Sequence, residues 1–161
     1  MKISEGKIYH IKDSYYKKFD KYNLMINIDK NHHSRPAYFA IKVNQICWFI
    51  PLSSKIEKYR AIISTKEKKY KICRSIMICN IENREFVILI QNAFPVLKEY
   101  IKCNHYINNK LVRVPYKVRK KVRNNFDYML SLKRKGLNLF FTDIDSILKV
   151  ILNDQNKKYK D

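Results

Sequence analysis

Two short segments carry side chains that can act on a phosphodiester. The first is a basic loop that contains His32, His33 and Arg35, and the second is Pro51–Leu52–Ser53–Ser54–Lys55. RNA brings its own nucleophile, because its 2′-OH can attack the adjacent phosphate. The protein then supplies a base, an acid and cations that balance the charge of the transition state. Imidazoles, hydroxyls and cations therefore suffice for RNA cleavage without a metal ion.

The elements between these segments must bring them together. Residues 37–43 and 46–52 are rich in β-branched and aromatic side chains, and Asn44–Gln45 separates them, which predicts a tight β-hairpin. The loop ends where the first strand starts, and the second segment begins where the returning strand finishes. Antiparallel pairing then brings Arg35 and Ser53 to the same end of the sheet.

We assign roles on that basis as a hypothesis. Ser53, with Ser54 beside it, orients or donates to the scissile phosphate, while Lys55 and Arg35 balance its developing charge. His32 or His33 moves protons, because an imidazole with an ordinary pKa near ~6.5 serves as base or acid at neutral pH. The spacing also fits a plainer interpretation, in which Ser53 caps a following helix and both histidines are solvated.

The charge of the chain indicates a polyanionic partner. There are 34 Lys and Arg against 14 Asp and Glu, a formal charge of +20. These cations are spread along the whole chain rather than gathered on one amphipathic helix, which favours nucleic acid over a membrane surface. Tyrosines and phenylalanines alternate with the basic residues, which suits phosphate contacts beside base stacking in single-stranded RNA.

The sequence lacks the residues that several other kinds of catalysis require. With only Gly6 and Gly136, no glycine-rich phosphate loop can form, and no carboxylate cluster is present for two-metal catalysis. The four cysteines form no Cys-x-x-Cys pair and are expected to be reduced core thiols, and the four histidines lack zinc-ligand spacing. We expect no metal, no small-molecule cofactor and no membrane partner.

Two basic segments are the expected RNA-binding faces. Residues 64–71 are polar and positively charged, and we expect a loop there. From Tyr116 to Arg134 an apolar stripe with helical spacing runs beside basic faces and ends at Gly136, which predicts a basic amphipathic helix. The expected RNA contacts are Lys66, Lys68, Lys69, Tyr70, Lys71, Tyr116, Lys117, Arg119, Lys120, Lys121 and Arg123.

The whole chain, 1–161, is expected to form one α+β domain with a single antiparallel sheet. Its longest apolar run, Ile46–Leu52, is too short to span a bilayer, and residues 1–15 lack the apolar core of a secretory signal, so we expect a cytoplasmic protein. Further strands are expected over 7–12, 75–80 and 85–91, with a broken segment at 94–96. A helix should follow Asp13–Ser14, and a last one should start at a Thr142–Asp145 capping box and give way to a frayed basic tail from about 156.

The order of several motifs resembles the toxins of type III toxin-antitoxin systems. The motifs are Ile8–Tyr9–His10–Ile11, Pro36–Ala37–Tyr38–Phe39, the segment from Pro51 to Lys55, and Pro115–Tyr116–Lys117 at the start of a basic helix. Together they span most of the chain. They are most similar to the CptN branch of the ToxN and AbiQ group, whose members are endoribonucleases inhibited by a pseudoknotted RNA antitoxin.

The resemblance implies a twisted antiparallel sheet flanked by helices, similar to the Kid and MazF toxins. It also implies metal-independent cleavage that leaves a 2′,3′-cyclic phosphate, and a closed complex of several toxin and RNA units. The Pro-Leu-Ser/Thr-Ser segment of the group maps onto Pro51–Ser54, so Ser53 and Ser54 take its hydroxyl role, and Lys55 is the nearest counterpart of its lysine. Where ToxN has a tyrosine and a lysine, this chain has His32, His33 and Arg35, and the identity of the base stays open. A non-catalytic basic RNA-binding protein, such as one bound to ribosomal RNA, remains the main alternative, ahead of a basic adaptor or membrane-surface protein.

Overall fold

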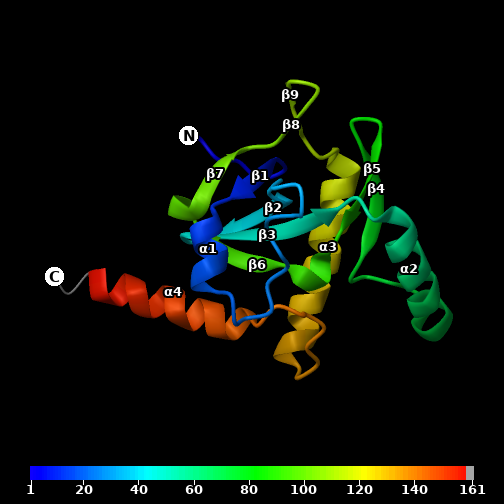
Figure 1. Cartoon of the computed structure of the whole chain (residues 1–161). Coiled ribbons are helices and arrows are strands. Elements are labelled where there is room, and N and C mark those ends of the chain that lie inside the picture. The colour runs from blue at the N-terminus through cyan, green and yellow to red at the C-terminus, as the bar shows by residue number, and fades with distance from the viewer. Residues whose placement is uncertain (159–161) are drawn as a thin grey trace.

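A long β-hairpin forms the centre of the molecule (Figure 1). Its strands are β2 (Pro36–Val43) and β3 (Ile46–Ser53), and Asn44 at the turn has a φ of +55°. Asparagine tolerates this left-handed conformation better than most residues, which explains why the chain reverses here. The hairpin predicted from the sequence is confirmed.

Five further strands extend this hairpin into one antiparallel sheet. Their spatial order is β4–β5–β3–β2–β1–β7, and β6 pairs with the part of β3 that β5 leaves free. The added strands are β1 (Ile8–Ile11), β4 (Met77–Ile81), β5 (Arg84–Ile88), β6 (Phe94–Leu97) and β7 (Ile101–Asn104). The predicted α+β class with an antiparallel sheet is confirmed.

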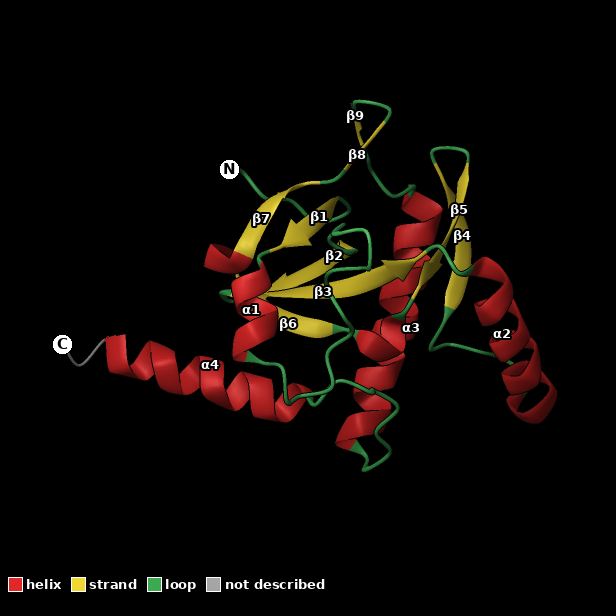
Figure 2. Cartoon of the chain, in the orientation of Figure 1, coloured by secondary structure: helices red, strands yellow, loops and turns green. Residues whose placement is uncertain are grey.

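The structure, a computed structural model, describes residues 1–158. Four α-helices and two short 3₁₀ turns surround the sheet (Figure 2). They are α1 (Asp13–Lys18), α2 (Ile56–Tyr70), α3 (Tyr116–Arg134), α4 (Ile144–Lys158), η1 (Ile90–Asn92) and η2 (Lys98–Tyr100). A small ribbon of β8 (Tyr106–Ile107) and β9 (Lys110–Leu111) stands apart from the main sheet and was not expected.

Each face of the sheet buries a separate apolar core. On one face, α3 packs Val122, Phe126 and Met129 into a cluster with side chains that include Trp48. On the other face, α1 and α4 cover a cluster rich in aromatic rings, in which Phe39 stacks on Phe49 at 5.1 Å between ring centroids. Apolar side chains that alternate along β1, β2 and β3 feed the two clusters, as expected for a sheet covered on both faces.

The basic amphipathic helix is present as predicted, and α3 ends as the sequence indicates. Gly136 has a φ of +93°, and the amide of Leu137 donates to the carbonyl oxygen of Leu132 at 3.0 Å. This is the Schellman arrangement, in which glycine supplies the left-handed residue that closes a helix. No helix within residues 1–158 has the length and apolar character that a membrane span requires.

The largest error of the sequence analysis concerns residues 64–71. The expected loop is the second half of α2, which runs to Tyr70 and ends at Lys71, where φ is +67°. Lysine and glutamate dominate this stretch and are good helix formers, although they give no continuous apolar stripe. Polarity alone was therefore a poor indicator of irregular structure here.

Three smaller expectations were also wrong. The cap of α4 is Asp143 rather than Thr142, because its carboxylate accepts from the amide and hydroxyl of Ser146 at 3.1 and 2.7 Å. Residues 156–158 of the expected frayed tail belong to α4, and residues 159–161 lie outside the described residues. Cys103 is exposed rather than part of the core, whereas Cys47 is buried.

Candidate functional site

Arg35 lies at the end of the central hairpin, beside the last residues of β3. The pairing of Ala37 with Pro51 places it opposite Ser53. Its Nη1 donates to the carbonyl oxygen of Leu52 and its Nε to that of Ile26, both at 3.0 Å. The guanidinium group is thus fixed between the sheet and the preceding loop, and three of its five N–H groups are left for a ligand. No acidic side chain within residues 1–158 pairs with it.

The Ser53–Lys55 segment turns the chain from β3 into α2. Ser53 is buried, and its hydroxyl oxygen accepts the amide N–H of Lys55 at 3.2 Å just before α2 begins at Ile56. The plainer interpretation of Ser53 as a helix cap is wrong, because the N-cap of α2 is Lys55 and no side chain caps the helix; Ser53 instead shapes the turn before it. Ser54 and Lys55 are exposed. The structure brings Arg35, Ser53, Ser54 and Lys55 to one end of the sheet, as predicted.

His32 and His33 lie in the loop before Arg35 and are exposed to solvent. The carboxylate of Asp29 organises this loop, because it accepts the amide N–H groups of Asn31 and His33 at 2.8 and 2.9 Å. The His33 ring is 3.7 Å from the same carboxylate, and His32 has a φ of +62°. The loop places both rings near Arg35 along the chain, but no contact joins either of them to Ser53 among the described residues.

A pair of histidines that the sequence analysis missed lies at the same end of the sheet. His10 in β1 is hydrogen-bonded through Nε2 to Nδ1 of His105 at 2.9 Å and through Nδ1 to the hydroxyl of Ser34 at 2.7 Å. His10 pairs with Pro36, the neighbour of Arg35. Side chains alternate along paired strands, so His10 lies on one face at this end of the sheet, whereas Arg35 and Ser53 lie on the other.

Burial keeps the His10 and His105 rings neutral at pH 7. Desolvation, followed by the nearby His10 ring and Arg84, lowers the pKa of His105 to about 4. Desolvation also lowers the pKa of His10, as does Lys102, and these effects outweigh the bond to Ser34, which raises it. A neutral imidazole in a short hydrogen-bonded chain is able to accept a proton.

No signal in the sequence around His10 or His105 could have predicted that the two rings are in contact. They are 95 residues apart, and the antiparallel pairing of β1 with β7 brings them together. His10 also sits within an apolar strand, where a single histidine reads as an ordinary core residue. To predict this contact one would need to know that β1 and β7 are neighbours in the sheet.

The predicted RNA contacts on α2 differ in exposure. Lys66 is half-buried, and its ammonium donates to the hydroxyl of Ser75 at 2.9 Å and to Oε1 of Gln91 at 3.3 Å. Lys68, Lys69, Tyr70 and Lys71 are exposed. The end of α2 therefore presents a basic surface, to which Lys66 contributes less than its neighbours.

The predicted contacts on α3 gather on its exposed side. Tyr116, Lys117, Lys120 and Lys121 are exposed, and Arg119 and Arg123 are half-buried. Arg123 forms an ion pair with Asp127 at 3.0 Å, one turn along the helix. Around it the α3 surface keeps an excess of positive charge that suits a nucleic-acid strand.

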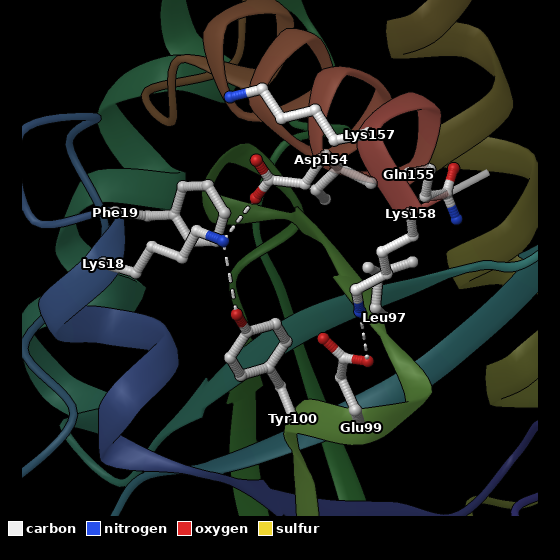
Figure 3. A pocket seen from close by; sticks show the side chains of 10 residues that line it. Lys18, Phe19, Leu97, Glu99, Tyr100, Asp154, Gln155, Lys157 and Lys158 are labelled. Atoms are coloured by element: carbon white, nitrogen blue, oxygen red, sulfur yellow. Dashed lines mark hydrogen bonds and ion pairs between the residues drawn. The ribbon is translucent and has the colours of Figure 1, made fainter. Parts of the chain in front are cut away.

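A hollow, apart from the residues around Arg35, lies between α1, η2 and α4 and has a volume of about 370 Å³ (Figure 3). Four of its five charged side chains are matched in pairs: Lys18 binds Asp154, and Lys158 lies 3.6 Å from Glu99, which leaves Lys157. The Lys18 ammonium also reaches the hydroxyl of Tyr100 at 3.5 Å. Cations that are already neutralised in this way make a weaker site for a polyanion than the unpaired Arg35.

Comparison with solved structures shows that this fold has been seen before. One matching structure is that of AbiQ, described as a lactococcal anti-phage endoribonuclease belonging to the type III toxin-antitoxin system. The match has a TM-score of 0.71 and covers 94% of this chain and 99% of AbiQ, at 17% sequence identity. At that identity the likeness establishes a shared fold, and the fold that the sequence resemblance implied is confirmed. No protein-family model matches the chain, and no curated protein matches it by sequence.

Proposed function

We propose that the protein is a metal-independent endoribonuclease and the toxin of a type III toxin-antitoxin system, acting on cellular RNA in the cytoplasm. The observation that carries the proposal is Arg35, an anchored guanidinium group that no acidic side chain pairs with within residues 1–158, directly after Ser34, whose hydroxyl is bonded to the neutral His10 ring. The AbiQ fold supports it, since AbiQ itself is described as an endoribonuclease of that system.

The chemistry follows from what these groups can do. The Ser34 hydroxyl takes the proton of the ribose 2′-OH and passes its own proton to Nδ1 of the neutral His10 ring, and the 2′-oxygen then attacks the adjacent phosphorus. Arg35 and Lys55 balance the charge that develops on the non-bridging oxygens, and Ser53 and Ser54 supply hydroxyl groups that position the phosphate. The bond to the 5′-oxygen breaks, and that oxygen takes a proton from His33 or His32. The products are a 2′,3′-cyclic phosphate and a 5′-OH end.

The proposed inhibitor is an RNA. We propose that a repetitive pseudoknot RNA binds the basic surfaces of α2 and α3, is cut by the toxin into its repeats and closes with it into a hetero-oligomer. The charge of +20 supports an extended RNA contact, because the segment around Arg35 holds only a small part of the cations.

The direct test is cleavage of a defined RNA in excess EDTA by the wild-type protein and by the Ser53→Ala variant. We expect cleavage by the wild type in chelator and a rate at least about tenfold lower in the variant. Full activity of the variant would remove Ser53 from the site. If the wild type binds the RNA tightly but leaves it intact in every buffer, the protein is instead a non-catalytic RNA-binding protein.

A further inference from the structure

A hollow of about 240 Å³ lies where the first turns of α3 cross β2, on the face of the sheet opposite α1. This is far more than the ~30 Å³ that one water molecule occupies. Basic and aromatic side chains line most of it: Arg119, Lys120, Arg123, Tyr38 and Tyr116, together with Glu5.

Gly6 leaves the space that the Arg119 side chain fills. A Cβ atom at Gly6 would lie 2.7 Å from both Cδ and Nη1 of Arg119. The Gly6 backbone cannot move away easily, because its amide donates to the carbonyl oxygen of Phe39 at 3.0 Å and its carbonyl oxygen accepts from the Val114 amide at 2.9 Å. Gly6 also has a φ of +81°, which glycine adopts at no steric cost. A residue with a side chain at position 6 would therefore displace the Arg119 side chain.

The Arg119 guanidinium is held in place without a partner for its charge. Its Nε is buried and makes no hydrogen bond, and no acidic side chain within residues 1–158 pairs with it. A buried donor on a charged group is expensive to leave unpaired, so the side chain is suited to an anionic ligand.

No acidic group that lines the hollow forms an ion pair with Arg119 in residues 1–158. The Glu5 carboxylate accepts the amide of Lys42 at 2.7 Å, and Arg123 is paired with Asp127. Burial raises the pKa of Tyr38 to about 12, although Arg119 and Arg123 act against the rise, so its hydroxyl is neutral at pH 7 and can donate to an anion.

An aromatic ring stands at the mouth of the hollow. Tyr116 is 69% exposed, and its ring centroid is 5.8 Å from the guanidinium carbon of Arg119. An exposed tyrosine next to an unpaired arginine offers a stacking surface for a base beside a binding site for its phosphate. We propose that this hollow binds one nucleotide of single-stranded RNA, with its phosphate on Arg119 and its base on Tyr116. The inference rests on the proposed RNA partner but not on cleavage.

The test is fluorescence anisotropy of a labelled 2′-O-methyl RNA oligonucleotide, which cannot be cleaved by attack of a 2′-OH. We expect Arg119→Gln to weaken binding by about tenfold or more and to reduce the slope of log K against log salt by about 0.7, as for one lost phosphate contact. Arg134→Gln removes the same charge from the exposed far end of α3 and should change the affinity less than about twofold.

Two more comparisons separate the phosphate from the base. Tyr116→Ala should weaken oligonucleotide binding by about fivefold. Competition by inorganic phosphate, measured against chloride at equal ionic strength, should be the same in Tyr116→Ala as in the wild type. In Arg119→Gln this competition should be lost. Gly6→Ala should behave like Arg119→Gln. Its control is Gly136→Ala, which has a similar backbone strain but no atom within 4 Å of the new methyl group.

Thermal melts of each variant report whether it is folded, and Arg119→Gln alone decides the matter if Gly6→Ala does not fold. Equal weakening by Arg119→Gln and Arg134→Gln would overturn the proposal, since the surface would then act only through its diffuse charge. Failure of RNA cleavage would leave this binding result untouched, so the two proposals can fail separately.

Discussion

The Nη1 atom of Arg35 lies 3.0 Å from the carbonyl oxygen of Leu52, across the end of the central hairpin. Together with the bond from Nε to Ile26, this contact fixes the guanidinium plane against the sheet. A cation that is held before the substrate arrives needs no reorganisation during the reaction, which is how enzymes stabilise a developing charge most effectively.

Arg35→Lys tests this anchoring. Lysine keeps the charge but cannot reach both carbonyl oxygens with one ammonium group, so we expect the cleavage rate to fall by about 100-fold, nearly as far as in Arg35→Gln. Single-turnover cleavage rates of the three proteins give the comparison. A lysine variant with nearly wild-type activity would mean that charge alone is needed at this position.

His10→Asn tests the proposed base. The pKa of His10 is lowered by burial, so the wild-type rate should rise with pH and its midpoint should lie below the ordinary histidine value of about 6.5. The variant should lose about 10² to 10⁴ in rate together with this acid limb of the profile. His33→Asn gives the contrast, because loss of a proposed acid should keep the acid limb of the profile and remove its alkaline limb. An unchanged profile in His10→Asn would assign the base elsewhere.

The same two histidines should make the folded state sensitive to acid. The pKa of His105 is about 4 in the folded protein, below the ordinary value of 6.5, so the unfolded chain binds more protons between these values and stability falls as the pH falls through this window. The difference corresponds to about 3.4 kcal/mol, which we discount to roughly 1–2 kcal/mol because the ring is only half-buried. Urea unfolding at pH 7 and pH 4.5 measures it, and His105→Asn should lose part of the pH dependence. An equal dependence in the variant would contradict this assignment.

The sequence predicted the central hairpin, the basic helix and the meeting of Arg35 with Ser53 because each depends on local signals. Strand patterns, a turn at Asn44 and an apolar stripe along α3 all act over short distances. The Ser34–His10–His105 chain depends on strand order instead, since β1 and β7 are neighbours only in space. Residues 64–71 were misjudged because a lysine-rich helix shows little apolar periodicity.

Lys66 is expected to act on stability more than on RNA binding. Its ammonium joins α2 to Ser75 and to Gln91, so Lys66→Met leaves two buried polar groups without this partner and should destabilise the fold by about 1–3 kcal/mol. Lys69→Met, on the exposed side of the same helix, should change stability by less than about 0.5 kcal/mol. Urea unfolding gives both values, and a neutral effect of Lys66→Met would show that these hydrogen bonds are dispensable.

The central claim is that the side chains around Arg35 direct the RNA's own 2′-OH against its phosphate. The most direct measurement uses two RNAs in excess EDTA, identical except for a single 2′-deoxynucleotide on the 5′ side of the mapped cleavage position. We predict that the all-ribose RNA is cut there and ends in a 2′,3′-cyclic phosphate, while the substituted RNA stays intact at that linkage. Cleavage of the substituted linkage, or a product with a free 3′-OH, would contradict the account.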